Sequence, residues 1–289
     1  MMQSFGDLRA TMQATPSARV WEALVDAIDE GMQARPDETA SVVLPYVRDH
    51  IARWPAHLAW FPERWMSSFE GEGPEALLML AVHLDLHDRG RCPPPRLRDL
   101  LAFLEGPYSA QVRTLQVRGL AIGAEGMRAL RGCRELRVLT LPRAGVRDDA
   151  LLALLKANPL RQLQELDLSG NHLTDHGAEV IASHAAFDVL HTLVLSHNFI
   201  GDDGALALAE GQALASLEAL ILEGNLIHDE GALALLDAAT RREWETLDVR
   251  DNALGFEAAR AFIEAGMEES LDDSWLDVYH DALVLPPHL

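Results

Sequence analysis

The sequence predicts an α/β solenoid, with parallel strands on the inside and helices on the outside, preceded by an all-α N-terminal domain. Three observations predict this fold. An eleven-residue phrase occurs four times, its first residues lie 27 positions apart each time, and alanine- and leucine-rich segments with helical spacing separate the copies. A fixed period of this length is typical of structural repeats that stack on one another.

The four phrases share apolar residues at positions 1, 4, 6 and 11 and an asparagine at position 9. They are LQELDLSGNHL, LHTLVLSHNFI, LEALILEGNLI and WETLDVRDNAL, beginning at Leu163, Leu190, Leu217 and Trp244. Two weaker copies, which begin at Val112 and Leu136, keep the apolar positions but lack the asparagine. We therefore expect about six repeats of 24–27 residues over residues 108–270.

Each repeat is predicted to contain a strand, a turn and a helix. Positions 3 to 7 alternate as in a strand, so that Leu166 points inward while Glu165 and Asp167 point outward. After position 11 the spacing becomes helical, and Asp175, Asp202 and Asp229 stand where helices are expected to begin. Because strands stack about 4.8 Å apart whereas helices need about 10 Å, the strand side should be concave, as in a horseshoe.

The asparagines at position 9 are expected to have a structural role. A buried amide at this point can satisfy backbone groups of the turn and of the neighbouring repeat, and its loss should cost roughly 1–3 kcal/mol. These ladder residues are Asn171, Asn198, Asn225 and Asn252.

The pattern LxxLxLxxNxL with its long period resembles the leucine-rich repeat. The helix openings TDHGAEVIA, GDDGALALA and HDEGALALL are similar to those of the ribonuclease-inhibitor-like class, which includes the Ran GTPase-activating protein. The resemblance covers about residues 112–270. It implies a platform whose inner face binds macromolecules, usually proteins.

Residues 1–107 are expected to form a helical domain of about four or five helices. Apolar residues recur at helical spacing over 18–33, 38–54 and 74–89, and a proline-rich turn and a helix are expected over 91–106. Such a domain would cover the apolar end of the first repeat. The alternative is a separate binding function centred on the three tryptophans of residues 54–65. Residues 271–289 break the repeat and are predicted to form a C-terminal cap.

Charge and composition limit the classes of function. The net charge is −21, and residues 162–289 contain 25 acidic residues against 4 arginines, which disfavours nucleic acid as a partner. Neither a signal peptide nor an apolar run of about 18 residues is visible, so a cytoplasmic protein without a membrane span is expected. Cys92 and Cys133 are expected to be reduced thiols.

The outward strand positions are predicted to bind a protein partner. Val194 and Ile221 should lie side by side at the centre of an otherwise polar face, with Ala219 beside them. Burying the pair would contribute roughly 3–6 kcal/mol before the costs of association. One end of this face is expected to be basic and the rest acidic, which would steer a partner of matching polarity. The predicted surrounding contacts are His191, His197, Glu165, Asp167, Arg113, Arg137 and Arg143.

Metal-binding and catalytic motifs are not found in the sequence. The pair His83 and His87 lacks the glutamate of HExxH, and the pair His172 and His176 spans a turn, so no metal site is predicted. The motifs GxxxxGK[ST], GxSxG and CxxC are missing, so neither an enzyme nor a cofactor is expected. The favoured function is a protein–protein interaction module. Two alternatives stay open: regulation of a small GTPase, which only the resemblance implies, and a structural or self-associating scaffold.

Overall fold

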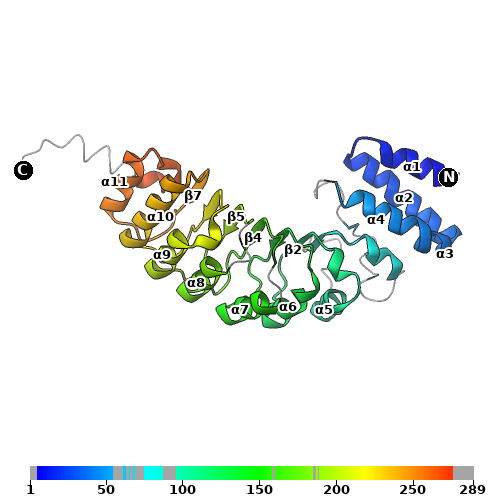
Figure 1. The fold of residues 1–289 in the computed structure, drawn as a ribbon, viewed down its shortest axis with the longest axis horizontal. Coiled ribbons are helices and arrows are strands. Elements are labelled where there is room, and N and C mark those ends of the chain that lie inside the picture. The colour runs from blue at the N-terminus through cyan, green and yellow to red at the C-terminus, as the bar shows by residue number, and fades with distance from the viewer. Residues whose placement is uncertain are drawn as a thin grey trace, which may run out of the picture. The chain divides into compact units, whose positions relative to one another are not determined.

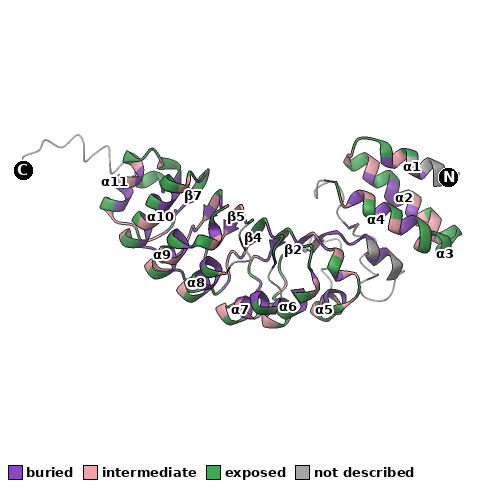
Figure 2. Cartoon of the chain, viewed as in Figure 1, coloured by how far each residue is buried: buried purple, intermediate pink, exposed green. Residues whose placement is uncertain are grey.

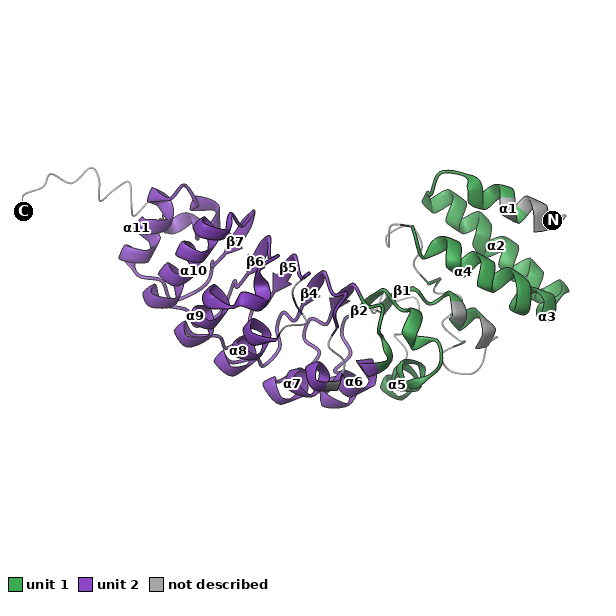
Figure 3. Cartoon of the chain, viewed as in Figure 1, with its two compact units in different colours: residues 1–117, 132–136 green, residues 118–131, 137–289 purple. Residues whose placement is uncertain are grey.

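The computed structural model describes residues 5–54, 61, 62, 65, 68, 75–86, 96–157, 160–184, 187 and 189–275. The chain forms two compact units, one of residues 1–117 and 132–136 and the other of residues 118–131 and 137–289 (Figure 3). Seven strands form a sheet in chain order, β1 to β7. Within the part of the chain that is described, no helix combines the length and the apolar character needed to cross a membrane.

The first unit begins with helices, as the sequence predicts. Its elements up to residue 51 are α1 (Phe5–Gln13), α2 (Ala18–Ala34), α3 (Pro36–Glu38), the π-helix η1 (Thr39–Val43) and α4 (Leu44–Ile51). The Ser17 hydroxyl caps α2 by accepting a hydrogen bond from the Val20 N–H at 3.3 Å. One face of α2 is buried, including Leu24 and Ile28. The helices expected over 18–33 and 38–54 are thus confirmed.

The prediction of a helix over residues 74–89 is wrong. This segment forms a 3-10 helix, η4 (Glu75–Leu80), and then a strand, β1 (His83–Leu86). β1 pairs in parallel with β2 (Thr114–Val117), with His83 opposite Thr114. A short apolar run fits a strand as well as a helix by periodicity, and pairing with β2 decides between them. The N-terminal segment is therefore not entirely helical, and the sheet has one strand more than the six predicted repeats.

The remaining described elements of the first unit are α5 (Leu97–Glu105) and the 3-10 helix η5 (Ser109–Gln111). α5 confirms the helix that the sequence predicts after the proline-rich turn. Tryptophans form part of the core of this unit: the ring of Trp21 makes edge contacts with those of Trp54 and Trp65, at centroid distances of 6.5 and 6.4 Å. Both partners are buried, which argues against the exposed tryptophan patch. Residues 55–60, including the third tryptophan of that segment, lie outside the described residues.

The second unit alternates strands with helices, and in Figure 1 its strands line one side while its helices line the other. Its strands are β3 (Val138–Thr140), β4 (Glu165–Asp167), β5 (Thr192–Val194), β6 (Ala219–Ile221) and β7 (Thr246–Asp248). Its helices are α6 (Gly123–Ala129), α7 (Asp148–Ala157), α8 (Asp175–Ser183), α9 (Asp202–Glu210), α10 (Asp229–Arg242) and α11 (Phe256–Glu264). Among the described residues that follow β2, three short segments form 3-10 helices: η6 (Leu130–Gly132), η8 (Gln212–Leu214) and η9 (Glu268–Ser270).

The apolar positions of each repeat form the core between strands and helices. Leu166, Leu168 and Leu173, which stand at positions 4, 6 and 11, are all buried. Figure 2 shows that the helices of this unit have a buried side and an exposed side, as amphipathic helices packed on a sheet should. The repeated sequence pattern therefore corresponds to a repeated strand and helix that share one continuous core.

The position-9 asparagines connect neighbouring repeats through the backbone. The Asn198 amide donates to the carbonyls of Leu168 and Leu195 at 3.0 and 2.9 Å, and its oxygen accepts from the Leu173 N–H at 3.1 Å. Leu168 and Leu173 belong to the preceding repeat. Equivalent bonds are made by Asn171, Asn225 and Asn252. Each amide thus satisfies backbone groups that the turn leaves without partners.

The aspartates stand at the starts of helices, as the sequence predicts, and they also form a second ladder between repeats. α8, α9 and α10 begin at these aspartates, but none of the three has a side-chain cap. Instead, Oδ1 of Asp175 accepts from the N–H groups of Gly201 and Gly204 in the next repeat, at 2.6 and 3.0 Å. The same bond to the next repeat is made by Asp148, Asp202 and Asp229. Helix-start carboxylates therefore link successive repeats.

The end of the second unit is described as far as Trp275. The Val249 N–H donates to the carbonyl of Ser270 at 3.1 Å, so the segment after α11 continues the backbone bonding beyond β7. Ser270 and Leu271 are buried. The rest of the predicted C-terminal cap, residues 276–289, lies outside the described residues.

Candidate partner-binding face of the repeats

The outward side chains of β3 to β7 form a continuous row across the second unit. We call this surface the strand face; it consists of repeat positions 2, 3, 5, 7 and 8. Parallel pairing aligns equivalent positions of adjacent strands. At position 5 the row is Thr140, Asp167, Val194, Ile221 and Asp248.

Val194 and Ile221 lie directly opposite each other in the register of β5 and β6, and Thr192 lies opposite Ala219. Paired strands are about 4.8 Å apart, so the two branched side chains are neighbours. Both are half-buried, whereas the inward residues Leu193 and Leu220 are fully buried. The strand face therefore presents two adjacent apolar side chains to solvent near the middle of β3 to β7.

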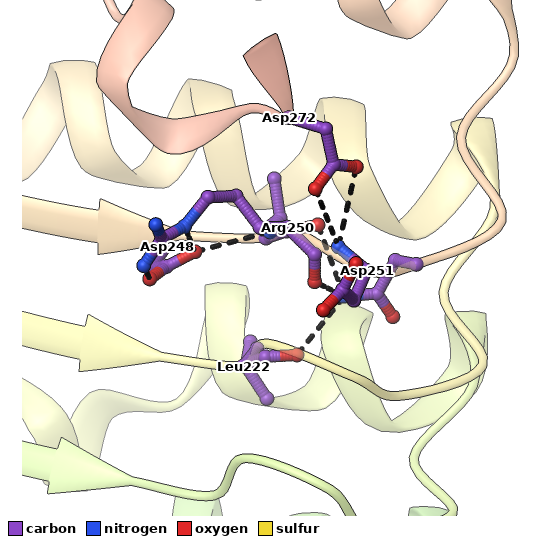
Figure 4. A network of polar contacts seen from close by, with 7 residues as sticks. Leu222, Asp248, Arg250, Asp251 and Asp272 are labelled. Atoms are coloured by element: carbon purple, nitrogen blue, oxygen red, sulfur yellow. Dashed lines mark hydrogen bonds and ion pairs between the residues drawn. The ribbon is translucent and has the colours of Figure 1, made fainter. Parts of the chain in front are cut away.

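Aspartates border this apolar pair on both sides. Asp167 is half-buried, and its Oδ1 accepts from the N–H of Ser169 at 2.9 Å and from the Ser169 hydroxyl. Asp248 is 6% exposed, and its carboxylate accepts from the backbone N–H and Nε of Arg250 at 3.0 and 2.9 Å (Figure 4). Asp248 occupies position 5, an outward position of the strand. Because Arg250 covers it, the exposed acids at this end include Glu218, Glu245 and Asp251 instead.

The pairing with Asp248 also stabilises the charged form of Arg250. Its hydrogen bonds to Asp248 and the attraction of that carboxylate raise the pKa of the guanidinium above its ordinary value. Close by, the Asp251 N–H points to both carboxylate oxygens of Asp272, at 3.2 and 3.3 Å, and Asn252 donates to the carbonyl of Leu222 (Figure 4). Intramolecular bonds thus fix the polar groups at this end of the strand face.

The three predicted arginine contacts differ in availability. In the first unit, Nη1 of Arg113 donates to the carbonyl of Ala52 at 2.5 Å, and the residue is half-buried. It therefore anchors its own unit, which the spacing of the sequence cannot reveal. Arg137, directly before β3, and Arg143, after it, are both exposed in the second unit.

The predicted histidine contacts occupy different environments. His191, at position 2, is half-buried, and His197, at position 8, is exposed. His197 has a left-handed backbone with φ 54, and its ring lies where a Cβ on Gly224 would be. Arg143 lies over Gly170 in the same way. The His197 ring therefore fills the space that the missing side chain of Gly224 leaves.

The described histidines of the two pairs considered for metal binding have different neighbours. His83 lies on a strand, not on the helix that its spacing suggested, and its Nδ1 is 3.0 Å from the Thr114 hydroxyl oxygen. His87 lies outside the described residues. The His172 ring stacks on Phe199, whereas His176 lies 3.4 Å from Glu179. Over the described ranges, no group of three metal-binding side chains is found.

The thiol of Cys133 is fully buried. Burial disfavours the thiolate and raises the pKa of Cys133 to about 12. Because the thiolate is the reactive form of cysteine, this residue is unsuited to nucleophilic chemistry at neutral pH. Cys92 lies outside the described residues.

Sequence reasoning missed one exposed apolar feature. Phe199 and Leu226, at repeat position 10, are each 52% exposed although both flanking positions are buried. Position 10 falls between the buried asparagine and the buried apolar residue at position 11. That alternation was visible in the sequence and would have identified both side chains as outward-pointing.

Comparison with known proteins finds leucine-rich repeats in the centre of the second unit, where the sequence pattern resembles them. A family model described as leucine-rich repeat matches residues 161–182, 189–209 and 213–236. A search of curated proteins finds no match. The matched segments contain β4, β5 and β6 and most of the helices that follow them. These matches and the parallel seven-stranded sheet fit a leucine-rich repeat protein.

Proposed function

We propose that this protein binds a protein partner on its strand face, with Val194 and Ile221 as the anchor of the interface. Leucine-rich repeats commonly mediate protein–protein interaction. The observation that carries the proposal is the register pairing of two half-buried apolar residues in a row whose other members are polar. Interfaces of this kind gain most of their free energy from a few central side chains.

The charges and apolar side chains of the strand face indicate what kind of protein would bind there. Exposed acids surround the apolar pair, among them Glu165, Glu218 and Glu245. A partner should therefore present apolar side chains flanked by lysine or arginine. Rim charges of this sort mainly steer association and select the partner, whereas the apolar pair would supply roughly 3–6 kcal/mol before the costs of association. Ala219 and His191 complete the contact area beside the pair, and Arg137 and Arg143 face an acidic part of the partner.

The test is a pull-down from lysate with the parent protein and the double variant Val194→Asp/Ile221→Asp. Leu233→Asp is the matched control, because Leu233 is an exposed leucine, 40% accessible, on helix α10. Circular dichroism first verifies that both variants fold. The captured protein is then purified and its affinity measured by calorimetry. We expect the double variant to lose binding and the control to retain it; equal binding by all three would refute the proposal.

Two other functions follow less directly from the chain. Regulation of a small GTPase depends only on family resemblance, and self-association on the general use of solenoids as scaffolds. Within the described residues, no feature favours either over binding of a different protein. A cytoplasmic location and the lack of enzymatic activity stay predictions from the sequence.

A further inference from the structure

A second exposed apolar row lies at the edge of the second unit, just beyond the asparagine ladder. We call it the edge strip; it consists of His172, Phe199 and Leu226, the position-10 residues of three successive repeats. All three are exposed. Their flanking residues at positions 9 and 11 are buried, so alternation of the backbone directs the position-10 side chains outward.

The backbone holds the edge strip at a regular spacing. Each of its residues donates its N–H to the position-11 carbonyl of the preceding repeat: Phe199 to Leu173 at 2.8 Å and Leu226 to Ile200 at 2.8 Å. The His172 and Phe199 rings stack with centroids 5.9 Å apart and an interplanar angle of 10°. An extended peptide repeats its side chains on one face every 6–7 Å, or about two residues. The separation of the two stacked rings is therefore close to the spacing of alternate side chains in an extended chain.

One end of the strip opens into a hollow of about 570 Å³. Phe199 and His172 form part of its wall together with Leu152, and the aliphatic and aromatic groups there suit an apolar side chain. Asp149 also lines the hollow. An apolar side chain seated here would thus have an exposed carboxylate next to it, together with the other polar groups of the lining, Arg147, Asp148, Thr174 and His176.

Exposed acids stand at repeat position 14, four residues after position 10, in the repeats of Phe199 and Leu226, whereas the repeat of His172 has His176 there. Asp203 and Glu230 are exposed and follow Phe199 and Leu226, and Asp149 holds the same position two repeats before Asp203. Neither Asp203 nor Glu230 belongs to the aspartate ladder, whose members stand one position earlier. The strip is therefore an apolar row with negative charge along one side, in a part of the chain that is already strongly acidic.

We propose that the edge strip is a second docking surface, which binds an extended, basic segment of a protein partner. Apolar residues at alternate positions of that segment contact Phe199, Leu226 and the hollow, and neighbouring lysines or arginines meet the acids of position 14. Charge complementarity selects this occupant, because acidic segments and anionic lipid surfaces are repelled. The strip differs in residues and in place from the strand face, so either surface can function without the other.

The test measures the binding of short labelled peptides to the 289-residue chain by fluorescence anisotropy. The probe carries leucines at two alternate positions among lysines and serines; one control replaces leucine by serine, and another replaces lysine by glutamate. We expect the probe to bind at least about tenfold more tightly than either control. Phe199→Ser should weaken probe binding about tenfold, and Asp203→Asn/Glu230→Gln should weaken it less, mainly at low salt. Leu233→Ser, a change of an exposed leucine on α10, serves as the matched control and should bind as the parent does.

Each other outcome would overturn the proposal. Equal binding of the leucine and serine peptides would mean attraction by charge alone. Loss of binding in Val194→Ser/Ile221→Ser, with Phe199→Ser unaffected, would assign the peptide to the strand face. Dimers that form with increasing protein concentration and disappear in Phe199→Ser would identify a second copy of this chain as the occupant. Failure of the probe to bind the parent protein would leave the strip without its proposed partner.

Discussion

Substitution of Gly204 by alanine tests whether the aspartate ladder restricts the sequence. Gly204 lies within α9, where alanine is normally favoured over glycine by about 0.5–1 kcal/mol. Its N–H, however, donates to Oδ1 of Asp175 in the preceding repeat at 3.0 Å. A Cβ on Gly204 would lie 2.6 Å from that oxygen, 2.8 Å from a methyl carbon of Ile200 and 2.9 Å from Cα of Asp175. All three distances are too short for a carbon atom.

The magnitude follows from what must move. Displacing the carboxylate weakens a hydrogen bond to a charged group, which contributes about 1.5–3 kcal/mol, and pressing a methyl group against the other two atoms costs about 1–3 kcal/mol. If the Asp175 carboxylate moves away, the steric contact is relieved but the hydrogen bond is weakened, and if it stays the reverse holds. We therefore expect one of these two free-energy losses to occur nearly in full. After subtraction of the helical preference, Gly204→Ala should destabilise the protein by about 0.5–2.5 kcal/mol.

Urea unfolding followed by circular dichroism measures this change. Ala207→Gly in the same helix calibrates the intrinsic preference and should cost about 0.5–1 kcal/mol. In an Asp175→Ala background the Gly204→Ala change should cost less than it does alone, since the carboxylate is no longer in contact. If Gly204→Ala leaves the free energy of unfolding unchanged or raises it, then the close approach of the two repeats does not constrain this position.

Three further predictions follow from named contacts. Asn198→Ala should lower the free energy of unfolding by about 2–4 kcal/mol, because it leaves buried backbone groups of two repeats unpaired. Asn252 makes the same bonds at a half-buried site, so Asn252→Ala should lower it by about half as much. Equal losses of the two variants in urea unfolding would contradict this. The pKa of Cys133 is raised from 9.0 to about 12 in the folded protein, so its contribution to stability is complete below pH 9 and is lost as the pH rises toward 12. The parent should therefore lose up to about 1.4 kcal/mol per pH unit more than Cys133→Ala in this range, and parallel curves of stability against pH would refute the assignment. Arg250→Ala should expose the carboxylate of Asp248 and increase the affinity of the strand face for a basic partner at low salt, as measured by calorimetry; an affinity unchanged at low salt would show that Asp248 does not contribute.

Much of the second unit was predictable because its sequence repeats. A single strand of three residues is too short for reliable assignment, but Leu166, Leu193 and Leu220 stand at the same position of successive copies and support one another. The parallel register then follows, since equivalent positions of stacked repeats must lie side by side. For this reason the sequence could predict that Val194 and Ile221 lie next to each other.

The sequence alone determined the repeat, its period and the direction in which most strand residues point, because these depend on local alternation of apolar and polar residues. The tertiary structure decided the contacts between elements. Residues 83–86 form a strand because β2 lies beside them as a parallel partner. Asp175 joins two repeats because the next helix begins within hydrogen-bonding distance of its carboxylate. Arg250 pairs with Asp248 and covers its carboxylate. Each of these depends on which groups meet in space, and the spacing of residues along one chain does not contain that information.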